Sequence, residues 1–210
     1  MTDMKKELFE RYPALLSCEK DIDAALELLK KTYTSGGTVY VCGNGGSCSD
    51  SDHIVGELMK GFLLKRPLSC AEKEKFENMF EGGKTFAEKL QGAIPAVSLT
   101  AQSAIISAYA NDVDPEFVYA QLVYGYAREN DLVIGLSTSG NSKNVVNAIK
   151  AAKVRGAKTL SMTGEKESKL SELSDITIKV PACETFKIQE YHLPVYHYLC
   201  AALEGEYFEI

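Results

Sequence analysis

The sequence is short of several features that mark common classes of protein. Its formal net charge is −6, so the basic excess of a nucleic-acid-binding surface is missing. No apolar run approaches the roughly 18 residues that a membrane-spanning helix needs. The opening residues, MTDMKKELFERY, are charged and amphipathic and lack the apolar core of a secretory signal. We therefore expect a cytoplasmic protein whose partners include neither nucleic acid nor a membrane.

Cysteine is present but is not arranged for crosslinks. The six cysteines are scattered along the chain, at Cys18, Cys42, Cys48, Cys70, Cys183 and Cys200. Without an export signal, free thiols are the expected state. Cys42 and Cys48 do not have the spacing of a zinc knuckle.

Strands and helices alternate from residue 38 onward, which predicts an α/β fold: a three-layer αβα sandwich around a five-stranded parallel sheet. The expected strands are 38–42, 94–100, 131–137, 157–163 and 175–180; the expected helices are 47–62, 102–110, 115–127, 142–154, 167–173 and 185–205. The run DLVIGLS is continuously apolar, as expected of a strand that is covered on both faces. With 45% hydrophobic residues, positions 1–210 are predicted to form a single domain.

Two segments extend this core. Residues 4–34 have helical apolar spacing, and Pro13 is expected to split them into two helices. Residues 63–92 are rich in lysine and glutamate and are interrupted by Gly82 and Gly83, which predicts an insertion with one or two short helices. A lid, a subunit contact and a solvated excursion all remain open for this insertion.

The first βα connection, CGNGGS, exposes backbone instead of building core. Asn44, Gly45, Gly46 and Ser47 lie between a predicted strand and a predicted helix, where ligands bind in open α/β sheets. Glycines let a ligand approach the backbone, and a helix N-terminus favours an anion. Cys48 stands where a dinucleotide fingerprint needs its third glycine, and the Gly-Lys-Ser/Thr of a P-loop is also missing. The turn is either a cradle for a small polar ligand or a tight connection.

A second connection, LSTSGNSKN, strengthens the ligand interpretation. Ser137, Thr138, Ser139 and Ser142 supply four hydroxyl groups around one turn, and a helix is expected to begin near Ser142. Hydroxyl groups and helix N–H groups together suit a phosphate monoester. One of the four is expected to cap the helix, but four exceed what capping requires.

Histidine is scarce, and two of the three histidines lie in patterns that suit a metal. His53 and Glu57 are four residues apart and share one helix face, so they can hold Zn²⁺ or a similar divalent ion, or form a surface pair. Gln189 and His197 lie on the last predicted helix, separated by a rise of about 12 Å. They meet one ion only if it lies between them, if the helix bends at Pro194, or if two chains contribute.

These motifs together resemble the sugar isomerase (SIS) domain family, and within it the phosphoheptose isomerases. The resemblance rests on CGNGGS, DSDHIVGEL, STSGNS and IQEYHLPVYH, and it covers nearly all of the chain except residues 63–92. It implies a phosphate held by Ser137, Thr138, Ser139 and Ser142, and a sugar against Asn44, Gly45 and Gly46. It implies a zinc site of His53, Glu57, Gln189 and His197, with Glu57 as the catalytic base and His197 as the acid. It also implies a homotetramer with active sites at subunit contacts.

The chain departs from the family pattern at positions that would contact the sugar. Gln102 follows SLT at the place where the family commonly has an acidic residue in contact with substrate. Phe186 and Lys187 replace a common Asp-Arg pair before IQE, and the insertion is longer than usual. The resemblance implies isomerisation of sedoheptulose 7-phosphate through an enediol. Another sugar phosphate, or a regulatory protein that only binds a sugar phosphate, remains an alternative.

Overall fold

The computed structural model describes residues 4–208 and contains one sheet of five parallel strands. The strands are β1 (Val39–Gly43), β2 (Ala96–Ser98), β3 (Leu132–Leu136), β4 (Lys158–Thr163) and β5 (Ile176–Lys179). Their order is β2-β1-β3-β4-β5, and every neighbouring pair is parallel. The chain therefore reverses its direction of winding between β1 and β3, and the loops after these two strands flank the crevice in which such folds bind ligands.

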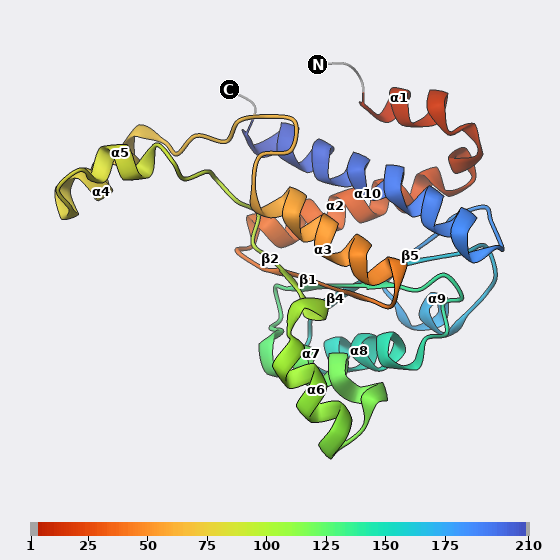
Figure 1. Cartoon of the computed structure of the whole chain (residues 1–210). Helices are drawn as coiled ribbons and strands as arrows, with labels where there is room; N and C mark the ends of the chain where they lie inside the picture. The colour runs from red at the N-terminus through yellow and green to blue at the C-terminus, as the bar shows by residue number, and fades with distance from the viewer. Residues whose placement is uncertain (1–3, 209–210) are drawn as a thin grey trace.

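Helices cover both faces of the sheet, so the predicted three-layer architecture is confirmed (Figure 1). One layer holds α1 (Met4–Arg11), α2 (Glu19–Thr34), α3 (Gly46–Met59) and α10 (Thr185–Phe208); the other holds α6 (Ser103–Asp112), α7 (Val118–Tyr126), α8 (Lys143–Val154) and α9 (Lys169–Leu173). Short 3₁₀ turns occupy Pro13–Cys18, Leu99–Ala101 and Pro115–Phe117.

The alternation of side chains along the strands explains the two cores. Val39 and Val41 belong to the cluster under α2, α3 and α10, whereas Tyr40 and Cys42 belong to the cluster under α7 and α8. Successive strand residues point to opposite faces, so an uninterrupted apolar strand feeds both layers. All six cysteines are free, as expected. Within residues 4–208, no helix has the length and apolarity needed to cross a bilayer.

Pro13 separates two helices, as expected, and a 3₁₀ turn lies between them. Two other helix ends need correction. The helix expected over 47–62 ends at Met59, because Lys60 adopts an extended backbone and Phe62 turns its N–H toward Glu204. The last helix continues through Pro194 to Phe208.

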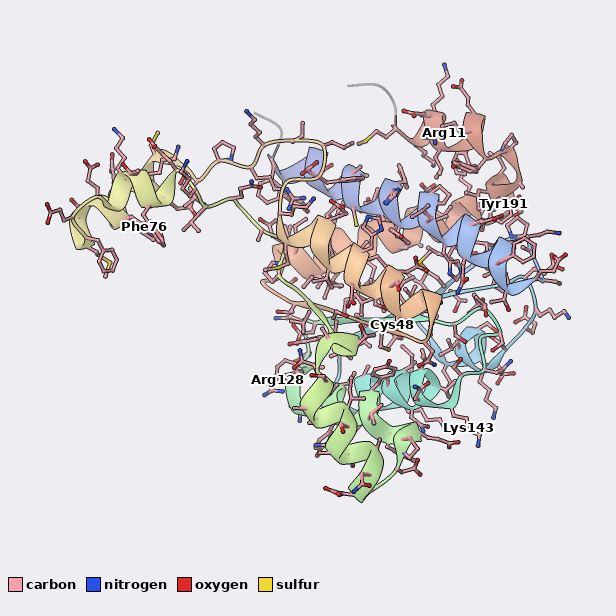
Figure 2. All side chains as sticks on the ribbon, viewed as in Figure 1. Arg11, Cys48, Phe76, Arg128, Lys143 and Tyr191 are labelled. Atoms are coloured by element: carbon pink, nitrogen blue, oxygen red, sulfur yellow. The ribbon has the colours of Figure 1, made fainter. Side chains whose placement is uncertain are left out.

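The insertion forms an arm that projects from the body (Figure 1). Its helices are α4 (Cys70–Met79) and α5 (Gly83–Ala87), which pack on each other through Phe76 and Phe86. Figure 2 shows Phe76 on this arm, away from the sheet. Met79, Phe80 and Phe86 are exposed.

The base of the arm is closed by contacts between its two ends. Gly92 donates its N–H to the carbonyl of Arg66 at 2.7 Å, and Pro67 and Gln91 form an antiparallel bridge. The Gln91 side chain also accepts the N–H of Gly61 at 2.7 Å. The arm therefore leaves and rejoins the body at one place.

Candidate active site

The turn between β1 and α3 presents open backbone at the carboxyl edge of the sheet. Gly45 has a φ of 57°, which favours glycine, and it precedes α3 without any side-chain cap. Ser47 is 3% exposed and donates its N–H to the carbonyl of Asn44 at 3.0 Å, so it supports the turn from within. A Cβ at Gly46 would lie 2.5 Å from the Gln189 amide nitrogen. The glycine therefore makes room for a polar side chain from α10.

The loop between β3 and α8 gathers the predicted hydroxyl groups. The Ser137 and Ser142 hydroxyl oxygens are 2.9 Å apart, and Ser139 accepts the Asn141 N–H at 3.2 Å. Gly140 makes the bend with a φ of 65°. Ser142 occupies the N-cap position but makes no capping hydrogen bond, so the expectation that a hydroxyl caps α8 is not met there. The first turn of α8 is left with a partial positive charge that favours an anion.

The two loops touch across the crevice between β1 and β3. Asn44 and Asn144 exchange amide hydrogen bonds of 2.8 and 2.9 Å. A cavity of about 330 Å³ lies beside this pair and is lined by Asn44, Pro115, Glu116, Ser142, Lys143 and Asn144. A second cavity of about 260 Å³ lies against Thr138 and Ser139 on the side of β4 and β5. The hydroxyl loop is thus accessible from both sides.

Farther along α3, three titratable side chains meet. His53 Nε2 lies 3.3 Å from Glu57 Oε1 and 3.4 Å from His197 Nε2, so α3 and α10 bring two imidazoles and a carboxylate together. The Glu57 side chain is 12% exposed, and Lys60 pairs with its second oxygen at 2.7 Å. Burial lowers the pKa of His197, and His53 lowers it further, so this imidazole is neutral near pH 7.

Asp50 and Tyr196 support His53 from behind. The Tyr196 hydroxyl lies 3.0 Å from His53 Nδ1 and donates to Asp50 Oδ1 at 3.2 Å. A hydroxyl has one proton, so a Tyr196 that donates to an ionised Asp50 accepts from His53 Nδ1–H. His53 Nε2 then faces Glu57 Oε1 at 3.3 Å, a separation that a shared proton or a shared metal ion can bridge.

The possible metal ligands His53, Glu57 and His197 nevertheless occur as close pairs and do not form a complete coordination shell. Imidazole nitrogens and carboxylate oxygens suit Zn²⁺, and tetrahedral bonds of about 2.0–2.1 Å put neighbouring ligand atoms about 3.4 Å apart. Within residues 4–208, however, no three His, Cys, Asp or Glu side chains are arranged to hold a metal ion. The distances of His53 to Glu57 and to His197 match ligand spacing, but the three side chains do not converge on one point. The site thus fits the ion's chemistry but is incomplete.

Gln189 lies apart from the imidazole cluster. Gln189 of α10 contacts Gly46 at the start of α3. His53 lies two helical turns beyond Gly46 on α3, which is a rise of about 10 Å. Gln102 lies between the 3₁₀ turn after β2 and α6, at the same edge of the sheet. The sequence therefore anticipates His53, Glu57 and His197 as neighbours, but a single chain does not bring Gln189 to them.

The structure also adds residues that the sequence analysis missed. Lys60 and Tyr196 contact the cluster directly, Asp50 accepts a hydrogen bond from Tyr196, and Arg66 contacts the backbone of Glu57. Asp50 lies three residues before His53, on the same helix face, which is a local signal. Lys60 is likewise three residues after Glu57. Tyr196 and Arg66 gave no local signal, because their contacts depend on how distant segments pack.

The fold and the site define a class: an α/β protein with two loops suited to an anionic ligand at the switch point of a parallel sheet. Residues 92–200 match the model of the SIS domain family. A phosphoheptose isomerase from Akkermansia muciniphila is 33% identical over 94% of this chain and 91% of its own length. One from Helicobacter pylori is 35% identical over 96% and 91%. The solved phosphoheptose isomerase of Francisella tularensis covers 98% of this chain and 100% of its own, with a TM-score of 0.77 and 25% identity.

The chain therefore belongs to the SIS domain family and, within it, to the phosphoheptose isomerases. It is an isomerase.

Proposed function

We propose that this isomerase interconverts sedoheptulose 7-phosphate and D-glycero-D-manno-heptose 7-phosphate through an enediolate. The names of its relatives support the substrate. The observation that carries the proposal is the meeting of Glu57 with His53, and of His53 with His197, on helices that begin beside the anion-binding loops. A carboxylate and a neutral imidazole are the base and the acid that an aldose–ketose conversion needs.

In this proposal the phosphate end of the substrate binds to the β3–α8 loop, and the sugar end binds to the β1–α3 turn. The phosphate accepts hydrogen bonds from the hydroxyl groups of the β3–α8 loop and from the first amides of α8: Ser137, Thr138, Ser139 and Ser142. The sugar lies against the β1–α3 turn and its neighbours: Asn44, Gly45, Gly46, Ser47, Gln102 and Gln189. Hydroxyls that bond each other in the free protein can turn toward a phosphate oxygen without reorganising the backbone.

The reaction moves a proton between C1 and C2. Glu57 Oε1 takes the proton from the substrate carbon and returns it to the neighbouring carbon, while Lys60 holds the other carboxylate oxygen. The neutral His197 imidazole has one N–H donor and one lone pair, so it can move a proton at the substrate oxygens near neutral pH. The low exposure of Glu57 strengthens these electrostatic interactions by keeping bulk water away.

We propose a divalent metal ion held by His53, Glu57, Gln189 and His197, and its ligand types favour Zn²⁺. Because Gln189 lies against Gly46 in its own chain, the Gln189 ligand would come from a neighbouring subunit. When bound, such an ion polarises the substrate oxygens and stabilises the charge of the enediolate. The close approach of His53 Nε2 and Glu57 Oε1, at 3.3 Å, supports a cation there. Metal analysis of the purified protein before and after dialysis against a chelator tests this point.

Substrate length supports self-association, which we propose to be a homotetramer. Glu57 lies three turns beyond Gly46 on α3, a rise of about 16 Å. An extended heptose spans only about 10 Å from C1 to phosphorus, at about 1.2 Å per bond. A substrate whose phosphate is bound by one subunit's loop thus presents its C1 to the Glu57 of another subunit. Glu57→Gln chains co-expressed with Ser142→Ala chains are assayed at substrate concentrations well below KM, where Ser142→Ala alone is impaired. Shared sites should make the mixed assemblies more active than either variant alone; mixtures no more active than the separate variants would refute shared sites.

We also propose that residues 1–210 act as a single domain in the cytoplasm. The six free cysteines support a reducing compartment. Both helical layers pack on the one sheet, which supports a single unit.

The decisive assay incubates the purified protein with sedoheptulose 7-phosphate and Zn²⁺ and follows formation of the aldose. Glu57→Gln should lose activity because an amide cannot accept the carbon-bound proton. Glu129→Gln is the matched control, since Glu129 is exposed and lies before β3 at the opposite edge of the sheet. Full activity in Glu57→Gln, or no product from the wild type, would contradict the proposal.

A further inference from the structure

One ionic contact in the body is completely enclosed, and it lies where the arm begins. Arg66 is 1% exposed and is among the largest fully buried side chains in residues 4–208. Its Nε donates to Glu204 Oε1 at 2.7 Å, and the Phe208 ring lies 4.8 Å from the guanidinium carbon. Glu204, on α10, is 0% exposed.

The Arg66 guanidinium also closes the end of the catalytic helix. Its Nη2 donates to the carbonyl of Glu57 at 2.9 Å, and its Nη1 donates to the carbonyl of Leu58 at 2.7 Å. Carbonyl groups in the last turn of a helix have no partners within the helix, and α3 ends at Met59. Arg66 therefore contacts the backbone of the residue whose carboxylate faces His53.

Glu204 fixes the chain that connects these residues. Its carboxylate accepts the N–H groups of Phe62, Leu63 and Leu64 at 2.7, 2.7 and 2.9 Å. Burial alone would raise the pKa of Glu204, but these amides and Arg66 outweigh burial and lower it, so the carboxylate is ionised. Three consecutive backbone N–H groups between α3 and Arg66 are therefore tied to α10.

A buried ion pair is weak support for stability by itself, because removing two charges from water costs about as much as their attraction returns. The geometry instead favours a role for Arg66 in positioning the last turn of α3. We propose that Arg66 is a positioning residue: through the carbonyls of Glu57 and Leu58 it holds the last turn of α3, so that the Glu57 carboxylate stays at the site. This inference rests on the proposed function, in which Glu57 is the base.

Two variants separate positioning from stability. Arg66→Lys keeps a positive charge for Glu204 but loses the planar pair of donors to the carbonyls. Glu204→Gln removes the charge pair but leaves Arg66 free to hold both carbonyls. We expect kcat of Arg66→Lys to fall about 100-fold at an almost unchanged KM, as for a base displaced by about 1 Å. We expect Glu204→Gln to keep kcat within about threefold while its melting temperature falls.

The experiment measures kcat, KM, the pH profile of kcat and the melting temperature for the wild type and both variants. A shifted acid limb in Arg66→Lys, absent from Glu204→Gln, is the signature of a displaced base. Equal losses of kcat in the two variants, or full activity in Arg66→Lys, would overturn the inference. If Arg66→Lys does not fold, Arg66→Gln, whose amide can donate to one carbonyl, is measured in the same way.

Glu57→Gln is assayed in parallel so that the two proposals can fail separately. An inactive wild type, or an active Glu57→Gln, would reject the proposed function itself. An active wild type with an inactive Glu57→Gln and a fully active Arg66→Lys would reject only the role of Arg66.

Discussion

Acidification should destabilise this protein through His192, a buried histidine that the reaction does not use. His192 is 0% exposed, and its Nε2 lies 3.4 Å from the Thr163 carbonyl. Among the residues that the structure describes, its Nδ1 has no hydrogen-bond partner. Burial lowers its pKa from 6.5 to about 4. Between these values the unfolded chain binds a proton that the folded chain does not, so stability falls as the pH drops below about 6.5. The full effect is about 3 kcal/mol, reached near pH 4.

The measurement is urea unfolding at a series of pH values from 7.0 to 4.5, for the wild type and for His192→Leu. Carboxylates titrate over part of the same range in both proteins, so the difference between the two curves isolates the histidine. We expect the wild type to lose about 2 to 3 kcal/mol more than the variant over this range, a large part of a typical domain's stability. Parallel curves would refute the assignment of a buried, neutral imidazole.

Three further outcomes follow from the loops and from the helix contact. Gly140→Ala should lower stability, because φ is 65° and the new Cβ would lie 2.1 Å from a serine hydroxyl oxygen; Gly36→Ala, with φ 70° and open space, is the control for the backbone strain of about 1–2 kcal/mol. Ser142→Ala should raise KM about tenfold, with kcat nearly unchanged, by removing a donor to the phosphate. Tyr196→Phe should lower activity and metal affinity about tenfold by releasing His53.

Each of these outcomes can be contradicted by a specific result. Equal melting temperatures for the two alanine variants would show that the contact at Gly140 does not matter. A fall in kcat without a change in KM for Ser142→Ala would place that serine at the reacting carbons instead of the phosphate. Wild-type metal affinity in Tyr196→Phe would show that the hydroxyl does not fix the imidazole.

The sheet was predictable because its strands carry their own signal. The segment DLVIGLS is apolar at consecutive positions, as a strand between two helical layers must be, and β3 lies within it. The hydroxyl loop was likewise predictable, since its residues are adjacent in sequence. His53 and Glu57 were predictable as neighbours because helix periodicity alone brings them together.

The contacts of the site that cross between elements were not predictable in the same way. Arg66 lies in a lysine-rich segment for which a solvated excursion was one interpretation, yet it is buried against a residue far along the chain. Its partner is fixed only when α10 packs beside α3. The position of Gln189 depends on the same packing, and local patterns contain no information about it. The resemblance to the family supplied what periodicity could not, namely that the two helices share a site.

The closed base of the arm makes the length of the insertion independent of the rest of the molecule. Gly92 returns the chain to Arg66 whatever lies between them, and the α4–α5 pair packs on itself. The turn at Phe80–Gly82 is therefore a suitable attachment point for an epitope tag or a fluorescent module. A reporter attached there would be connected to the body only through the arm, so the sheet and both ligand loops would keep their geometry.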